Sequence, residues 1–351
     1  MHRIAVIGTG DLARAVCHSL AVTASVPVEV VVIGRDPLKT GRMCFIANAR
    51  AAARGRGGAR FTPFTGELEQ PLAEVAGALV CASSQSPWER LTSPSAWTGL
   101  VDRAGYGITL PFQAELALRA GRALPGGAWL VNGCFPDAVN PLLAASGVPV
   151  LCGIGNVAAL AAGAQVALGL PDQSALRLLA HHVHLHAPAE GQDEVRAWHG
   201  GDPVAAPADL VAALRDAERT QLNQITGVAA AALLDAVLTG AVLETNLPGP
   251  LGLPGGYPVT VTGASVALRL PAGVGQAEAV AFNQRAAAAD GVVVDGGRVV
   301  FAPALAEHLP EFADAIAVDD FAVAAARLHG LRERLRGEPP ARQRGGVEMP
   351  V

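Results

Sequence analysis

The sequence is poor in lysine, in tyrosine and in charge of either sign. Lys39 is the only lysine among 351 residues, the only tyrosines are Tyr106 and Tyr257, and charged residues make up 16% of the chain. No Walker loop ending in Gly-Lys-Ser/Thr and no Tyr-x-x-x-Lys pair can therefore be formed. A lysine Schiff base would have to use Lys39, so mechanisms of these three kinds are disfavoured.

Cysteine is also scarce, and a basic excess is absent. The five cysteines include no C-x-x-C pair, and an odd count in a chain with no export signal indicates reduced thiols, so we expect a cytoplasmic protein. A net charge of −5 offers no surplus for a phosphate backbone, and nucleic acid is not expected as a partner. The longest apolar stretches are broken by Asn156, Gln165 and Asp235, so no membrane partner is expected either.

What the chain does contain is a hydrophobic fraction of 51%, enough for two lobes with large cores. A β-branched run over 4–8, a helical pattern over 11–22 and a second apolar run over 28–33 form a βαβ unit. Further strand patterns alternate with helical ones. This alternation predicts an α/β fold, a doubly wound parallel Rossmann sheet over residues 1–155 with strands at 78–82, 128–132 and 148–154 and helices at 111–122 and 136–145.

The pattern changes after residue 155, and we expect a second, α+β lobe over 156–336 for substrate binding and oligomerisation. A long loop is predicted at 83–107, and the tail at 337–351 is expected to be disordered. The elements expected in the second lobe are a helix over 156–168, a short strand over 181–187, an interrupted helix over 207–243, turn-rich strands through 257–270, a hairpin over 293–301 and helices to 336.

The first strand ends in a glycine-rich loop typical of dinucleotide binding. Gly8, Thr9, Gly10, Asp11, Leu12 and Ala13 fit the pattern G-x-G-x-x-A between a strand and a helix. Such a loop places a diphosphate on the free N–H groups of the helix N-terminus. These six residues are therefore candidates for cofactor binding, and Ser83, at the start of the loop after the 78–82 strand, is another.

The end of the second strand indicates which dinucleotide is bound. An acidic residue there would accept hydrogen bonds from a ribose 2′-hydroxyl, but this chain has Gly34 and Arg35. A guanidinium pairs with a 2′-phosphate, so Arg35 favours NADP(H). The alternative is NAD, with Arg35 a solvated turn residue and Asp36 in the acidic role.

The order of several segments resembles the lactate/malate dehydrogenase family. The segments are 3–10, 131–141 (Val-Asn-Gly-Cys-Phe-Pro-Asp-Ala-Val-Asn-Pro), 150–155 and 222–226. The resemblance implies a Rossmann lobe, a mixed catalytic lobe, hydride transfer in the crevice between them, and a homo-oligomer, which we expect to be a homodimer. It further implies that Asn132 approaches the nicotinamide ribose and that Thr226 lines the substrate pocket.

The chain departs from this family at the catalytic positions. The family's helix after the Gly-Ile-Gly strand end carries an Asp that orients the catalytic histidine and an Arg that binds the substrate carboxylate, whereas residues 156–165 contain neither. Counting back from Trp198 places Glu190 at the histidine's position, and a gap would bring in His186 instead. The stretch of this chain that resembles the family's mobile loop keeps an arginine, Arg90.

A histidine cluster at 181–186 offers another candidate site. On a strand, His182, His184 and His186 would share one face, which makes a metal conceivable. No Cys, Asp or Glu lies within the run, and hydride transfer needs no metal, so a half-exposed strand is favoured over a metal site and no metal is expected. The middle case is that one histidine donates a proton, and His184 is a candidate for the substrate pocket.

These observations favour an NADP(H)-dependent oxidoreductase that reduces a C=N or C=O group of a small amino-acid-like or oxo-acid substrate in specialised metabolism. Reduction of a ketone needs an acid, whereas an iminium carbon needs only a carboxylate such as Glu190 to stabilise its charge. One alternative is a 2-oxo acid or ketone reductase with His186 or His184 as the acid and Arg90 binding the carboxylate. Another is a non-catalytic NADP(H)-binding sensor or assembly protein.

Overall fold

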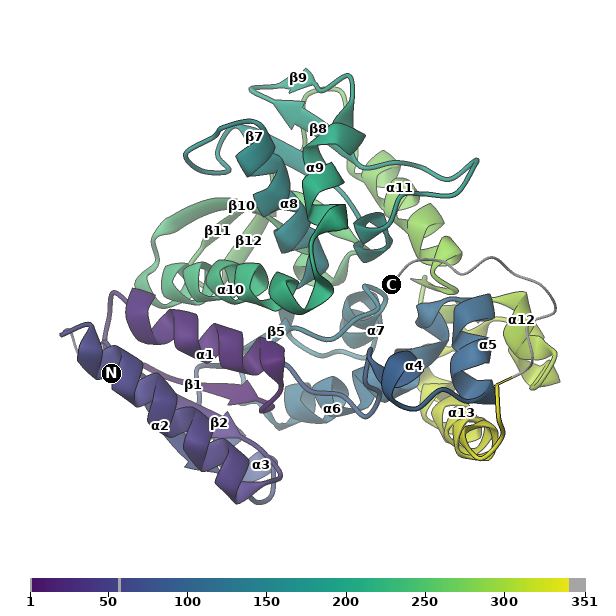
Figure 1. Ribbon diagram of the computed structural model, residues 1–351, viewed down its shortest axis with the longest axis horizontal. Coiled ribbons are helices and arrows are strands. Elements are labelled where there is room, and N and C mark those ends of the chain that lie inside the picture. The colour runs from purple at the N-terminus through teal and green to yellow at the C-terminus, as the bar shows by residue number, and fades with distance from the viewer. Residues whose placement is uncertain (1, 56–57, 341–351) are drawn as a thin grey trace.

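A six-stranded parallel sheet forms the centre of the first lobe in the computed structural model, which describes residues 2–55 and 58–340 (Figure 1). The strand order is β3-β2-β1-β4-β5-β6. The first three strands are added towards one edge of the sheet and the last three towards the other, and in such sheets a crevice opens at the carboxyl ends of the strands where the order reverses, here between β1 and β4. The predicted doubly wound sheet is confirmed. Its strands are β1 (His2–Ile7), β2 (Val28–Ile33), β3 (Ala59–Phe64), β4 (Gly77–Val80), β5 (Trp129–Asn132) and β6 (Val150–Gly153).

Helices cover both faces of this sheet because its strands are apolar on both sides. Ile4 and Val6 of β1 belong to one hydrophobic core with α1 (Asp11–Thr23) and α2 (Pro37–Ala53). Ala5 and Ile7 alternate onto the other face and join α3 (Glu69–Leu72), α6 (Leu110–Ala123) and α7 (Val139–Ala145).

The second lobe combines helices with two small antiparallel sheets. Helix α10 runs beside α1 and joins the lobes (Figure 1). With the turn before it, α10 forms one segment, Arg219–Thr239, that is long and apolar enough to cross a membrane, and half of its apolar window is buried inside the protein. The elements are α8 (Asn156–Ala167), β7 (Leu176–Leu179), β8 (Arg196–His199), β9 (Asp202–Pro203), α9 (Pro207–Asp216), α10 (Leu222–Thr239), β10 (Val242–Pro248), β11 (Gly256–Thr262), β12 (Ser265–Leu268) and α11 (Gln276–Ala289).

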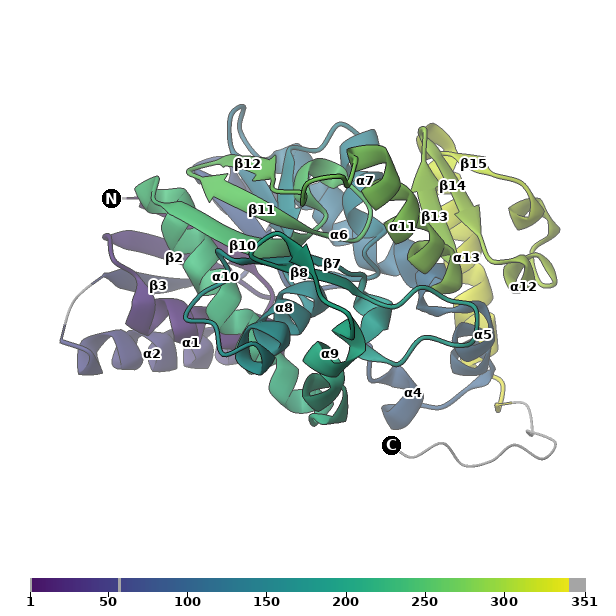
Figure 2. The ribbon, with the colours of Figure 1, turned by 90° about the horizontal axis from the view of Figure 1, so that it is seen from above.

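The chain then returns to the first lobe. The predicted hairpin is present as β13 (Val292–Asp295) and β14 (Arg298–Phe301), with Gly296 and Gly297 at positive φ in the turn. It continues through α12 (Pro303–Ala306), β15 (Ile316–Ala317) and α13 (Phe321–Arg336). This segment lies beside α5 and α6 (Figure 2) and shares one hydrophobic core with them. Most of the expected disordered tail, residues 341–351, lies outside the described residues.

Two predicted elements are wrong. The loop expected at 83–107 contains α4 (Glu89–Thr92) and α5 (Ala96–Ala104). Ser95 caps α5 by a reciprocal pair of hydrogen bonds with Thr98, and the helix buries Trp97 and Leu100, a spacing that the surrounding Ser, Pro and Gly residues obscure.

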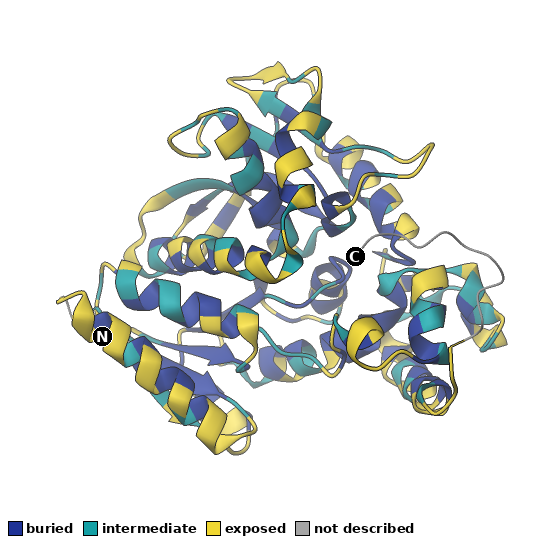
Figure 3. Cartoon of the chain, in the orientation of Figure 1, coloured by how far each residue is buried: buried dark blue, intermediate teal, exposed yellow. Residues whose placement is uncertain are grey.

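The strand expected at 181–187 is instead a 3₁₀ turn over His182–Leu185. The backbone N–H of His181 donates to Nδ1 of His184 at 2.8 Å, and this side-chain bond replaces a strand ladder. The histidines therefore do not share one face. His182 and His184 are buried, whereas His186 is exposed. Figure 3 shows that buried residues fill the central sheet and that exposed ones gather on the outer faces of the helices and on the loops.

Candidate active site

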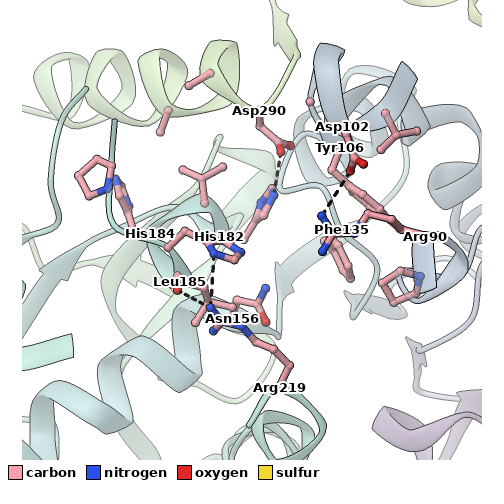
Figure 4. A pocket seen from close by; sticks show the side chains of 18 of the residues that line it. Arg90, Asp102, Tyr106, Phe135, Asn156, His182, His184, Leu185, Arg219 and Asp290 are labelled. Atoms are coloured by element: carbon pink, nitrogen blue, oxygen red, sulfur yellow. Dashed lines mark hydrogen bonds and ion pairs between the residues drawn. The ribbon is translucent and has the colours of Figure 1, made fainter. Parts of the chain in front are cut away.

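Two cavities meet between the lobes, at the carboxyl ends of the central strands. The narrower one has a volume of about 280 Å³ and is lined by the glycine-rich loop and by β5 and β6. The wider one, shown in Figure 4, has a volume of about 830 Å³ and is lined by α4, α5, α11 and the 182–193 segment. His182, Phe135, Asn156 and Trp88 line both cavities, so a ligand in one is adjacent to a ligand in the other.

The glycine-rich loop has the shape that a dinucleotide diphosphate requires. Gly8 has φ +124°, and a Cβ there would lie 2.9 Å from the carbonyl oxygen of Cys81, so no side chain fits. A Cβ at Gly10 would meet no atom within 4 Å, which leaves the N-terminus of α1 open, and no side chain caps that helix. Ala13 is fully buried against the sheet. The residues at the mouth of the narrower cavity are Gly10, Asp11 and Leu12.

The end of β2 presents Arg35 to solvent. Gly34 precedes it, and a Cβ at Gly34 would lie 2.2 Å from Oγ1 of Thr40 and 2.7 Å from Cγ2 of Thr9, so no acidic side chain fits at this position. The carboxylate of Asp36 caps α2, accepting from the N–H groups of Leu38 at 2.9 Å and Lys39 at 3.1 Å. Arg35 is exposed and stands beside this cap.

Three further predicted residues line the narrower cavity. Asn132 is buried, and its amide bonds the loop after β5, donating to the carbonyl of Cys134 at 2.9 Å and accepting from the N–H of Cys134 at 3.0 Å. Thr226 is buried, with Oγ1 3.4 Å from the carbonyl oxygen of Gly155. The hydroxyl of Ser83 donates to the carbonyl of Gln85 at 2.8 Å. Asn132 thus shapes the cavity through the loop that it holds.

His182 stands where the two cavities join, with a carboxylate near each ring nitrogen and the backbone N–H of Asp137 donating to Nδ1 at 3.4 Å. Its Nε2 lies 3.2 Å from Oδ1 of Asp290, and its Nδ1 lies 3.6 Å from Oδ1 of Asp137. The backbone N–H of His182 also donates to Oδ2 of Asp137 at 2.9 Å, which fixes the loop after β5 against the end of β7. All three side chains are buried. Phe135 packs against the imidazole, and Tyr106 stacks on Phe135.

The contacts among His182, Asp290 and Asp137 shift the pKa values of these side chains. Burial alone would lower the pKa of His182, but the carboxylates of Asp290 and Asp137 raise it to about 10. Burial would likewise raise the pKa of Asp137, but the two adjacent imidazoles hold it well below its usual value. The carboxylates therefore favour the imidazolium form of His182, and the imidazoles favour the carboxylate form of Asp137.

Asp137 and His182, together with the neighbouring His181, also meet the geometric requirement for a metal site. Asp137, His181 and His182 each offer a ligand atom, and the three atoms lie within 4.8 Å of one another. Burial lowers the pKa of His181 to about 3, so this ring is neutral. Sequence reasoning had placed the possible metal on His182, His184 and His186, which the turn does not bring together.

The structure separates the catalytic residues that were predicted. Glu190 is exposed on the loop after the histidine turn and lines neither cavity. His186 lies on the wider cavity, where partial desolvation and the nearby Arg219 lower its pKa. Both ring nitrogens of His184 are bonded to backbone groups, of His181 at 2.8 Å and of Asp193 at 3.1 Å. Arg90 lines the wider cavity from α4 and pairs with Asp102 at 3.5 Å.

Sequence reasoning missed the group formed by His182, Asp137 and Asp290. Asp137 lies in the 131–141 segment, and a search for acidic residues at strand ends could have found it. Asp290 follows α11, more than a hundred residues beyond His182, and no pattern in the sequence links the two.

Comparison with known proteins bears out the architecture. No protein-family model matches the chain, and neither does any curated protein sequence. Among solved structures, the lactate dehydrogenase of Cryptosporidium parvum, complexed with lactic acid and β-nicotinamide adenine dinucleotide, is 15% identical and superposes with a TM-score of 0.52, covering 81% of this chain and 94% of its own.

Two malate dehydrogenases superpose similarly. The Aeropyrum pernix structure is 16% identical, with a TM-score of 0.50 over 81% of this chain and 95% of its own. The Cryptosporidium parvum malate dehydrogenase is 16% identical, with a TM-score of 0.50 over 82% of this chain and 96% of its own. The chain therefore has the fold of the lactate and malate dehydrogenases.

Proposed function

We propose that this protein is an NADP(H)-dependent oxidoreductase that reduces a C=O or C=N group of a small amino-acid-like substrate, with His182 as the proton donor. The observation that carries the proposal is the position of His182. It is a buried imidazole, held between the carboxylates of Asp137 and Asp290, at the junction of a cavity lined by a dinucleotide-type loop and a wider cavity open to substrates. The lactate dehydrogenase of the same fold binds its cofactor and lactic acid together.

The residues present fit a nicotinamide dinucleotide. The open space beside Gly10 and the uncapped N-terminus of α1 suit a diphosphate, and the narrower cavity continues from there to His182. When bound, the reduced cofactor supplies a hydride. The protein's part is to hold the acceptor carbon beside the narrower cavity and to place a proton at the atom that gains negative charge.

His182 can supply that proton because its two nitrogens have different surroundings. Asp137 contacts Nδ1, bonds the backbone of His182 and lines the narrower cavity, so it fixes the orientation of the ring. Nε2 points to Asp290 on the wall of the wider cavity, the side from which a substrate would approach. Asp137 thus takes the orienting role that the resemblance assigns to an aspartate on the following helix, where this chain has none.

Asp290 makes C=N reduction as compatible with the site as C=O reduction. A ketone oxygen bound at Nε2 would take the proton of His182 as the alkoxide forms. An iminium group arrives with its positive charge, and the carboxylate of Asp290 would stabilise it without any proton transfer. This role was expected of Glu190, which lines neither cavity, whereas Asp290 lines the wider cavity beside Nε2 of His182.

The preference for NADP(H) over NAD(H) is supported at the end of β2. Gly34 leaves no room for the acidic side chain that would bind a ribose 2′-hydroxyl, and the carboxylate of Asp36 is used in capping α2. Arg35 remains exposed beside this position, where it can pair with a 2′-phosphate.

The test is the rate of NADPH oxidation with a panel of 2-oxo acids and cyclic imino acids, for the wild type and for His182→Gln. We expect kcat for a carbonyl substrate to fall by about 10²-fold or more in the variant, because a general acid contributes on this order. His199→Gln is the matched control, since it changes an exposed histidine that lines neither cavity, and it should lose less than about threefold. Equal losses in the two variants, or no oxidation of any substrate in the panel, would contradict the proposal.

A further inference from the structure

Most charged side chains around the wider cavity are neutralised by partners in the wall itself. Arg90 pairs with Asp102 at 3.5 Å, Arg285 pairs with Asp193 at 2.7 Å, and Glu89 pairs with Arg336 at 2.6 Å. These pairs leave little charge for a ligand to meet. A charged group that the wall leaves without such a partner is therefore informative about the ligand.

Arg219 is such a group. Its Nη2 donates to the carbonyl of Leu185 at 2.8 Å and lies 3.5 Å from Nδ1 of His186. Its Nη1 is buried and has no hydrogen-bond partner in the described part of the chain, and no carboxylate there lies within 4.0 Å of the guanidinium. A buried guanidinium nitrogen without an acceptor is costly, and the cavity is where an acceptor can come from.

Asp290 is the second such group, with the opposite charge. Its Oδ1 contacts His182, but its Oδ2 is buried and has no hydrogen-bond partner among residues 2–55 and 58–340. His182 lies between the carboxyl groups of Asp290 and Asp137, so a cationic ligand group at Oδ2 would favour the ionised form of Asp290, whose pKa burial raises. In the view of Figure 4, Asp290 and Arg219 lie on opposite sides of His182.

We propose that the wider cavity binds a zwitterion, with a carboxylate of the ligand on Arg219 and a cationic nitrogen on Oδ2 of Asp290. The inference rests on the proposed function and deepens it, because it assigns the two poles of an amino-acid-like substrate to two residues. A carboxylate would give Nη1 of Arg219 a charge-assisted hydrogen bond, and an ammonium or iminium group would do the same for Asp290. The volume of about 830 Å³ leaves room for an aliphatic chain between the poles.

Three probes of equal chain length test the inference by calorimetry on the protein saturated with NADP⁺: 5-aminopentanoate, pentanoate and pentylamine. We expect 5-aminopentanoate to bind at least about tenfold more tightly than either singly charged probe. Arg219→Gln should abolish its advantage over pentylamine, and Asp290→Asn its advantage over pentanoate. Arg285→Gln removes a cavity arginine that is already paired, and it should leave all three affinities within about twofold.

The wild-type comparison alone can overturn the inference, so it does not depend on the stability of any variant. Equal affinities for the three probes, binding of none of them, or equal effects of Arg219→Gln and Arg285→Gln would each do so. Titration of NADPH by fluorescence keeps the two proposals apart. Absence of NADPH binding contradicts the proposed function, whereas NADPH binding without a preference for the zwitterion contradicts only the inference about the cavity.

Discussion

The C-terminal helix α13 should hold the segment that carries Arg90 in place. Arg336 donates from Nε to Oε1 of Glu89 at 2.7 Å and from Nη2 to Oε2 at 2.6 Å. One turn earlier on α13, Arg332 donates to the carbonyl of Ser84 at 3.1 Å. Its guanidinium carbon lies 3.9 Å from the centre of the Phe112 ring. The 84–90 segment borders both cavities. We therefore predict that Arg336→Gln lowers both the stability of the fold and the affinity for substrate.

The magnitude follows from the burial of the two partners. The side chain of Glu89 is 10% exposed and that of Arg336 is 31% exposed. Removal of one partner of a fully buried pair costs about 3–5 kcal/mol. The partial exposure of Arg336, and the bond that Gln85 still donates to Glu89 at 2.6 Å, reduce the expected loss to about 2 kcal/mol.

A double-mutant cycle measures this contribution. The free energy of unfolding in urea is compared among the wild type, Arg336→Gln, Glu89→Gln and the double variant, and we expect a coupling energy of about 1–2 kcal/mol. Arg334→Gln is the matched control, because Arg334 lies on the same helix, is exposed and should change stability by less than about 0.5 kcal/mol. A coupling energy near zero, or a KM for substrate that Arg336→Gln leaves unchanged, would refute the reasoning.

Two further predictions concern His182 and Arg35. The pKa of His182 is raised to about 10 in the folded protein, so its contribution to stability should be complete below its ordinary pKa of 6.5 and lost as the pH rises through about 10. The free energy of unfolding in urea, measured for the wild type at about pH 7 and about pH 10.5, should show this loss. The same comparison for His182→Gln should not show it. Reduction of a ketone should fall over the same upper range, since the acid form is required, and a decline centred near pH 6.5 would show instead that the carboxylates do not control the group. Arg35→Asp should shift the preference from NADPH toward NADH by about tenfold, measured as the ratio of the two dissociation constants, and an unchanged ratio would remove Arg35 from the cofactor site.

The first lobe could be predicted in detail because its signals are local. The apolar runs of β1 and β2, the glycine-rich turn between β1 and α1, and the alternation of strands with helices each lie within about thirty residues of sequence. Strand β3 was not predicted, because its six residues, Ala-Arg-Phe-Thr-Pro-Phe, include a proline and lie at the edge of the sheet. Edge strands carry a weaker apolar pattern than central ones.

The group of His182, Asp137 and Asp290 could not be predicted in the same way, because it is assembled from three distant segments. Asp137 follows β5, His182 follows β7 and Asp290 follows α11, and only the packing of the second lobe on the sheet brings them within 4 Å. The count from Trp198 to Glu190 assumed that the loop before β8 has the length found in the family. In the structure the histidine turn follows directly after β7, and the loop that contains Glu190 borders the wider cavity, but Glu190 itself lies outside the cavity lining.

The position of Asp137 explains how the chain can lack the aspartate of the family's helix and still hold a charged histidine. Helix α8 begins at Asn156, and the next residues of its first two turns are apolar, so these turns carry no carboxylate that could orient an imidazole. The loop after β5 starts at the same carboxyl edge of the sheet as α8, because β5 is the neighbour of β6. The amide of Asn132 holds this loop in place. A carboxylate on that loop reaches the same ring from a different element. A search for acidic residues at the positions implied by the resemblance does not find Asp137, because it lies on the loop after β5 and not on α8.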